Sequence, residues 1–169
     1  MGGPREKPGR GRRVRGYPPS VSARGLPADT TPARAAPGDV EVFQVDERDS
    51  SWEDDHPRFR VYLHGGDGDV PGAWTDTYDV IGADLLQVVD WAQHQAGDRL
   101  TYAVALVGAD GGGRRGLVWL VGMDANEGTD PGSRLEGIQQ RMLLRRRHPV
   151  RLGTADAMPA DVPQPYAQD

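Results

Sequence analysis

Cysteine is missing from the 169-residue sequence, and no long apolar run occurs in it. The first absence excludes disulfide bonds, thiolate metal ligands and a cysteine nucleophile. The second argues against a membrane span, since no stretch approaches the roughly 18 consecutive apolar residues that such a helix needs. No apolar segment follows the basic residues after Met1, so a secretory signal is not expected. We therefore expect a cytoplasmic protein without membrane association.

Lysine is nearly missing as well: among the 20 basic residues, only Lys7 is a lysine and the others are arginines. This bias is typical of a GC-rich bacterial genome and reflects codon usage, not function. Apolar residues make up only 37% of the chain, which has 23 Gly and 14 Pro. A chain of this length and composition is expected to form one ordinary domain, with some segments lacking regular structure.

The net charge of −5 is unevenly distributed: it is +6 over residues 1–38, −13 over residues 39–130 and +2 over residues 131–169. Residues 1–38 and 154–169 show no apolar periodicity, so they cannot bury enough apolar surface to offset the entropy lost on ordering. We therefore expect four regions: a disordered basic Pro/Gly/Arg-rich arm (1–38), an acidic α+β domain (39–130), a C-terminal helix with a basic end (131–153) and a disordered tail (154–169).

Strand patterns recur inside the acidic domain. Alternating side chains or short apolar runs predict five strands, which cover Val40–Asp46, Arg58–His64, Trp74–Val80, Leu100–Val107 and Leu117–Met123. Asp76 interrupts the apolar face of the third strand. The last two strands form a hairpin with a glycine-rich loop over residues 108–116. Phosphate-binding loops run from a strand into a helix N-terminus, so this strand-to-strand loop is better explained as a flexible turn.

Two helices are predicted. Over Gly82–Ala96, apolar residues at helical spacing form one stripe, which consists of Leu85, Val88, Val89, Ala92 and Ala96. Over Arg134–Arg146, Ser133 and Glu136 have the spacing of a capping box. The expected fold class is therefore α+β: a small antiparallel sheet in the order strand, strand, strand, helix, strand, strand, with one packed helix and a further C-terminal helix.

The densest chemistry is an acidic cluster ahead of the second predicted strand. It contains six carboxylates and a histidine, namely Asp46, Glu47, Asp49, Glu53, Asp54, Asp55 and His56. A calcium loop supplies ligands at alternate positions around a glycine, and this pattern is absent. A zinc site needs histidines at defined spacing, whereas His64 is eight residues further on. We favour a solvated acidic loop; a weak divalent-metal site and a catalytic carboxylate are the alternatives.

Support for catalysis is weak. Ser50 and Ser51 lie near His56 in the sequence, but the G-x-S-x-G nucleophile elbow is absent. His94 falls on the polar side of the first predicted helix, where we expect it to be exposed. We find no catalytic residues, no metal ligands and no cofactor-binding motif, and we predict that the protein is not an enzyme.

The arm carries the sharpest electrostatic feature, the segment GRGRRVRG. Its arginines can neutralise nucleic-acid phosphates, as disordered arginine-rich segments do; they are Arg10, Arg12, Arg13 and Arg15. The alternatives are a solvated terminus and an arm that folds back onto the acidic domain. That domain itself repels nucleic acid.

The last two predicted strands are apolar on both faces, unlike strands of a sheet with one face in water. In the last strand, Leu117, Trp119, Val121 and Met123 are expected on one face, and Val118 and Leu120 on the other. The first helix can cover only one face, so the other must be covered by the second helix, a second copy of the chain or a partner.

The candidate interface residues are Val118, Leu120, Leu135, Ile138 and Met142. We therefore predict a non-enzymatic accessory or interaction protein, whose acidic domain binds a protein partner or a second copy of itself. Nucleic-acid association through the arm is the first alternative. An enzyme with a metal site in the acidic loop is the second.

Overall fold

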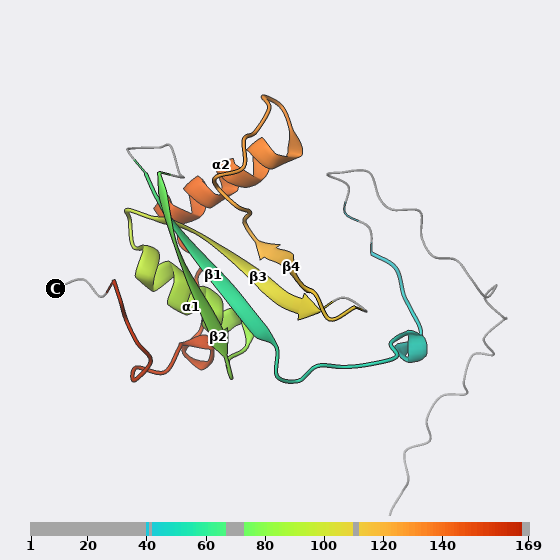
Figure 1. Cartoon of the computed structure of the whole chain (residues 1–169). Helices are drawn as coiled ribbons and strands as arrows, with labels where there is room; N and C mark the ends of the chain where they lie inside the picture. Colours follow the sequence, from blue (N-terminus) through green and yellow to red (C-terminus); the bar gives the residue numbers. More distant parts are fainter. Residues whose placement is uncertain (1–39, 41, 67–72, 110–111, 167–169) are drawn as a thin grey trace, which may run out of the picture. The chain divides into compact units, whose positions relative to one another are not determined.

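The computed structural model of the chain (Figure 1) describes residues 40, 42–66, 73–109 and 112–166. The elements follow one another as η1 (Glu47–Asp49), β1 (Arg58–Gly65), β2 (Trp74–Ile81), α1 (Leu85–Ala96), β3 (Thr101–Ala109), β4 (Arg115–Val121), α2 (Arg134–Arg147) and η2 (Thr154–Asp156). The predicted arm, with Arg10, Arg12, Arg13 and Arg15, lies outside the described residues.

The four strands form one antiparallel sheet in the order β2-β1-β3-β4. Two hairpins, β1–β2 and β3–β4, are joined through α1, and they meet where β1 pairs with β3 (Figure 1). β1 and β3 are therefore the central strands, and β2 and β4 form the edges. The predicted α+β class is confirmed, with an antiparallel sheet and two helices.

The strand predicted over Val40–Asp46 is not present: residues 40 and 42–46 take no strand conformation. The side chain of Val42 is 94% exposed, and those of Phe43 and Val45 are exposed too. Alternation supplies strand propensity, but a strand also needs a neighbour to accept its backbone hydrogen bonds. In the described part of the chain, no strand adjoins this segment, so the predicted order has one strand too many.

The main core lies between one face of the sheet and α1. Val61 and Leu63 of β1 face Val88 and Ala92 of α1, and all four side chains are buried. The helix begins at Leu85 because Asp84 caps it: its Oδ1 accepts a hydrogen bond from the backbone N–H of Gln87 (2.9 Å). The Gln87 side chain in turn accepts one from the Asp84 N–H (3.1 Å).

The opposite face of the sheet carries a smaller core with α2. Its buried members are Ala103, Met123, Ala125 and Met142, and Tyr62, Leu135 and Ile138 pack around them. α2 begins where predicted, because the Ser133 hydroxyl accepts a hydrogen bond from the Glu136 N–H (3.1 Å). The Glu136 carboxylate accepts a hydrogen bond from the Gly132 N–H (2.5 Å), whereas a capping box would use the N–H of Ser133. The second helix therefore covers part of the second face.

The segment predicted as a tail runs along α1. The Trp91 indole N–H donates to the carbonyl of Pro163 (2.9 Å), and the Met158 N–H donates to Asp90 Oδ2 (3.0 Å). Met158, Val162 and Tyr166 pack against the main core. The expectation of a disordered tail therefore needs correction over residues 154–166: apart from the short turn η2 the segment has no helix or strand, but it is held in place.

This segment also explains the acid that interrupts the apolar face of β2. The Tyr166 hydroxyl donates a hydrogen bond to the Asp76 carboxylate, which raises the pKa of Tyr166. The Tyr166 ring stacks on Trp74, with 6.3 Å between the ring centroids. Asp76 is thus a polar partner for the C-terminal segment.

Candidate protein-interaction surface

β4 is an edge strand whose side chains are unusually apolar. Among the described residues it pairs with β3 and with no other strand, so every second backbone N–H and C=O group points away from the sheet. Four consecutive apolar side chains are exposed on it, namely Leu117, Val118, Trp119 and Leu120. Edge strands normally carry charges that block pairing with another chain, whereas the one charged residue of β4 is Arg115. The edge is therefore open to strand addition.

A bulge changes the predicted faces of β4. Val104 pairs with Val121 and Ala105 pairs with Trp119, so Leu120 is the extra residue. Val121 consequently packs against the main core under α1, whereas Trp119 lies on the face of Ala105. The prediction that Leu117, Trp119, Val121 and Met123 share one face was wrong, because alternation cannot show where a bulge lies.

Gly122 turns the chain at the end of β4. Its φ is +72°, and an added Cβ would lie 3.0 Å from the Cβ of Ala103 and 3.1 Å from the carbonyl oxygen of Tyr102. Only glycine fits this conformation next to β3 without strain. The turn places Met123 in the smaller core with α2 and opens a groove between the end of β4 and the helix.

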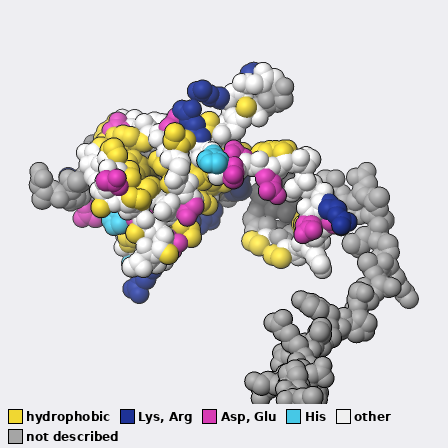
Figure 2. All heavy atoms as spheres, turned by 90° about the horizontal axis from the view of Figure 1, so that it is seen from below, with side chains coloured by type: hydrophobic (Ala, Val, Ile, Leu, Met, Phe, Trp, Pro, Cys, Tyr) yellow, Lys and Arg dark blue, Asp and Glu magenta, His cyan; other side chains and the backbone are white. Residues whose placement is uncertain are grey.

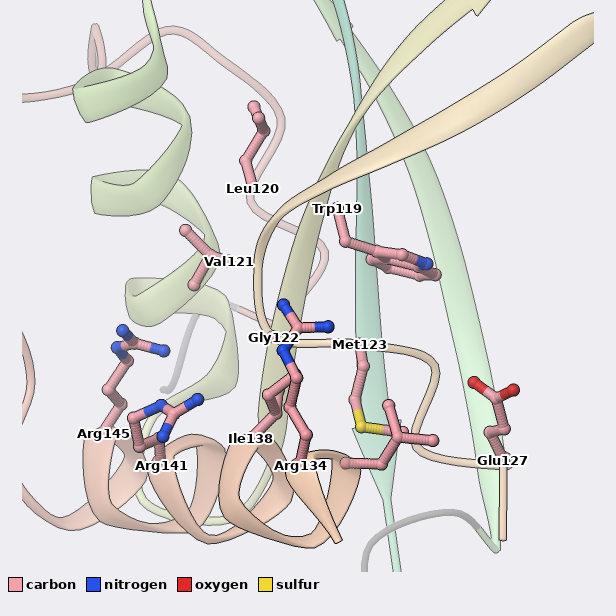
Figure 3. Close-up of a pocket in the computed structure, with 11 residues that line it drawn as sticks. Trp119, Leu120, Val121, Gly122, Met123, Glu127, Arg134, Ile138, Arg141 and Arg145 are labelled. Carbon is pink, nitrogen blue, oxygen red and sulfur yellow. The ribbon is translucent and has the colours of Figure 1, made fainter. Parts of the chain in front are cut away.

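The groove has a volume of about 250 Å³. β4 and the turn contribute Trp119, Leu120, Val121, Gly122 and Met123, and Glu127 from the following loop also lines the groove (Figure 3). From α2, Leu135 and Ile138 supply apolar lining, and Arg134, Arg141 and Arg145 supply positive charge. The groove is thus apolar on the strand side and basic on the helix side.

The three groove arginines share one side of α2 because they are seven and four residues apart. At a rise of 1.5 Å per residue they span about 16 Å of the helix axis. Figure 3 shows the three side chains along α2, with the Arg134 guanidinium beside Gly122. The ion pairs found among the described residues involve none of the three. Their charge is therefore available to a ligand.

Two other arginines form a contrast with these. Arg58 and Arg60 of β1 both bind the Asp79 carboxylate on the neighbouring strand, and the Arg60 Nε lies 2.7 Å from Asp79 Oδ1. Hydrogen bonds from Arg60 and then Arg58 lower the pKa of Asp79 to about 2 and raise that of Arg60. The two guanidinium groups share this one carboxylate, which links β1 to β2.

The five predicted interface residues take different places. Leu120, Leu135 and Ile138 line the groove, Val118 is exposed on the β4 edge, and Met142 is buried beneath α2. The groove arginines were missed as a group. Their spacing along one helix side was a signal in the sequence, but only the position of β4 relative to α2 shows that this side faces a groove.

The acidic loop is solvated. Asp46 caps η1 by accepting a hydrogen bond from the Arg48 N–H (2.9 Å), and the exposed His56 and Asp55 side chains lie 2.7 Å apart. A shallow pocket of about 550 Å³ lies between this segment and the start of α1, lined in part by Asp54 and Leu85. Within the described residues, no three His, Cys, Asp or Glu side chains converge as metal ligands.

The histidines serve structural or solvent-exposed roles. His64 is buried, and its Nδ1 lies 3.0 Å from the Thr75 hydroxyl, to which the Asn126 side chain also donates (3.1 Å). Burial lowers the pKa of His64, so the imidazole is neutral near pH 7. His64 thereby ties β1 and β2 to the loop before α2. His94 is exposed, as expected, with Nδ1 3.4 Å from Asp90.

Neither α1 nor α2, the two α-helices of the described residues, is long and apolar enough to cross a membrane. No protein family, curated protein or solved structure matches the chain.

Proposed function

We propose that the protein is a non-enzymatic interaction protein that binds an extended, acidic segment of a protein partner along the β4 edge and the α2 groove. The observation that supports this proposal is the coincidence of an apolar edge strand with three arginines that have no carboxylate partner among the described residues.

The exposed β4 edge is the reason to propose an extended ligand. A segment that adds to a sheet edge gains main-chain hydrogen bonds, and its alternate side chains contact those of the edge strand. Val118 is 58% exposed and Leu120 is 41% exposed, so both have apolar surface to bury against such a segment. The opposite edge, β2, is less suitable because two of its four exposed residues, Thr77 and Asp79, are polar, and Tyr166 stacks on a third, Trp74.

The arginines of the groove are the reason to propose an acidic ligand. Guanidinium groups form bidentate hydrogen bonds with carboxylates. Arg141 and Arg145 are about 6 Å apart along the helix axis, close to the ~6.8 Å between alternate side chains of an extended chain. Nucleic acid is a weaker candidate for this surface, because residues 39–130 carry a net charge of −13.

Capture experiments on the full-length chain test this proposal. We expect a Val118→Lys/Leu120→Lys bait to lose at least one protein that the wild-type bait captures from a lysate of the source cells, because lysines block strand addition. An Arg141→Glu/Arg145→Glu bait should lose the same protein. Ile81→Lys, an exposed position on the β2 edge, is the matched control and should retain it.

Two outcomes contradict the proposal. Captured proteins that all bind the β4 and α2 variants as well as the wild type would place recognition on another surface. Captured proteins released by nuclease treatment would show that nucleic acid, and not a protein segment, is the ligand. Circular dichroism of each bait confirms that it is folded.

A further inference from the structure

We infer that the segment bound at this surface is residues 42–55 of a second copy of the chain, so that the protein forms a homodimer by reciprocal strand addition. The inference rests on the proposed function, since it uses the β4 edge and the groove, and it names the partner.

The donor segment exposes the side chains that a strand uses. Val42, Phe43 and Val45 are β-branched or aromatic residues, and all three are exposed in the single chain. Figure 2 shows hydrophobic and acidic side chains next to one another on the segment that precedes β1. A soluble monomer seldom leaves such residues and an apolar edge strand uncovered at once.

The charges of donor and groove are complementary. The donor strand, residues 42–46, ends in Asp46, and five further carboxylates follow within nine residues, namely Glu47, Asp49, Glu53, Asp54 and Asp55. Of the ion pairs found among the described residues, the one that involves this segment is Asp55 with its neighbour His56. In the described part of the chain, the acids therefore form no ion pair with an arginine side chain, and the groove arginines form none with an acid.

The position of the groove sets the orientation of the donor. The groove lies at the Val121 end of β4. If residues 42–46 run parallel to β4, the carboxylates that follow arrive at this end and meet the arginines of α2. The antiparallel orientation would carry them to the Arg115 end, away from the groove. Charge complementarity therefore selects a parallel addition.

The short connection to β1 favours parallel addition to a second copy. β4 is parallel to β1, because each is antiparallel to β3. For a chain to place its own residues 42–46 parallel to β4, residues 47–57 would have to return along the sheet to the start of β1. Such a crossover needs a dozen or more residues, whereas this connection has eleven, three of them in η1. In a symmetric dimer, each copy adds its donor segment to the β4 edge of the other copy, so both edges are paired.

Light scattering of the full-length chain after size-exclusion chromatography tests the inference. At about 100 μM we expect a mass twice that of the 18.3 kDa chain, which falls on dilution. Val42→Asp/Val45→Asp on the donor and Val118→Lys/Leu120→Lys on the edge should each weaken dimerisation about ten-fold or more. Leu144→Asp, an exposed apolar position outside both surfaces, is the matched control and should dimerise as the wild type does.

A charge exchange tests the pairing directly. Glu47→Arg/Asp49→Arg and Arg141→Glu/Arg145→Glu should each weaken the dimer, and their combination in one chain should restore it. Asp46 is left unchanged because it caps η1.

Three outcomes overturn the inference: a wild-type chain that is monomeric at this concentration, a dimer that resists the donor substitutions, or a charge exchange without rescue. A dimer lost through Val118→Lys/Leu120→Lys but kept by the donor variant would still show that β4 is an interface. Failure of the inference is then distinguishable from failure of the proposed function, which depends on capture through β4 and α2.

Discussion

Replacing Met142 by alanine tests whether α2 is held on the sheet as described. Met142 is 2% exposed and is the buried residue of α2, in contact with the cluster of Ala103, Met123 and Ala125. Truncation of a buried Met to Ala costs about 2–5 kcal/mol, from lost transfer free energy and the cavity left behind. This core is small and is bordered by half-buried side chains that can collapse into the cavity, so we expect the lower half of the range, about 2–3 kcal/mol.

Urea unfolding followed by circular dichroism measures this loss. With a slope of about 1–3 kcal/mol per M urea, the midpoint should fall by about 1–2 M. Leu144→Ala on the same helix is the matched control: the side chain is 55% exposed, so its loss should cost well under half as much. Equal effects of the two substitutions, or no effect of Met142→Ala, would refute the docking of α2 through the smaller core.

Three further predictions concern charge, the C-terminal segment and the arm. The pKa of Asp79 is lower in the folded state than in the unfolded state, so the stability it contributes is present above about pH 4 and is lost as the pH falls toward 2. Between pH 5 and pH 2.5, the urea midpoint of Asp79→Asn should therefore fall less than that of the wild type. An equal fall in both proteins would contradict this. A chain ended after Gly153 should melt several degrees lower and show altered Trp91 fluorescence, because residues 154–166 pack on α1; equal melting temperatures would show that they do not. Any nucleic-acid binding should be lost on deletion of residues 1–16 and should follow salt with a log–log slope of about −4 to −5, for four to six phosphate contacts; binding that ignores salt would refute the arm hypothesis.

Local signals predicted the helices well. Four residues of the predicted apolar stripe are buried as expected, namely Val88, Val89, Ala92 and Ala96, because they face the sheet. Leu85, at the first position of α1, is exposed, so the stripe is one residue shorter than predicted. The Ser133 cap predicted the start of α2 correctly, since capping is a contact between residues close in sequence. Features that depend on adjacent residues could thus be predicted.

Features that depend on distant partners could not. Val42 and Val45 look like part of a strand, but strand formation depends on an adjoining strand, which the described part of the chain does not supply. The bulge at Leu120 arises from the pairing of β4 with β3 and leaves no trace in the alternation of β4 alone. Met158, Val162 and Tyr166 have no period because the segment contacts α1 at isolated points.

The candidate surface illustrates the same limit. The apolar character of Val118 and Leu120 pointed to an interface, but the sequence left open whether the second helix, a second copy or a partner covers them. The structure shows that α2 covers one end of the second face and leaves the β4 edge open beside Arg141 and Arg145. The position of α2 relative to β4 depends on the turn at Gly122. Apolar periodicity in the sequence does not show the direction of this turn.

The strand order β2-β1-β3-β4 also has a kinetic consequence. The β1–β2 and β3–β4 hairpins are local and can close early, whereas β1 meets β3 only after the chain has passed through β2 and α1. Pairing β1 with β3 closes a long loop, and the chain loses this entropy before the contacts between the two strands form. The joining of the hairpins should therefore limit the folding rate. Since α1 packs on both central strands, Val88→Ala should mainly slow refolding, whereas Val118→Ala on the outer strand should leave the refolding rate nearly unchanged. A refolding rate that responds equally to both would mean that the outer strand is already in place when the two halves of the sheet come together.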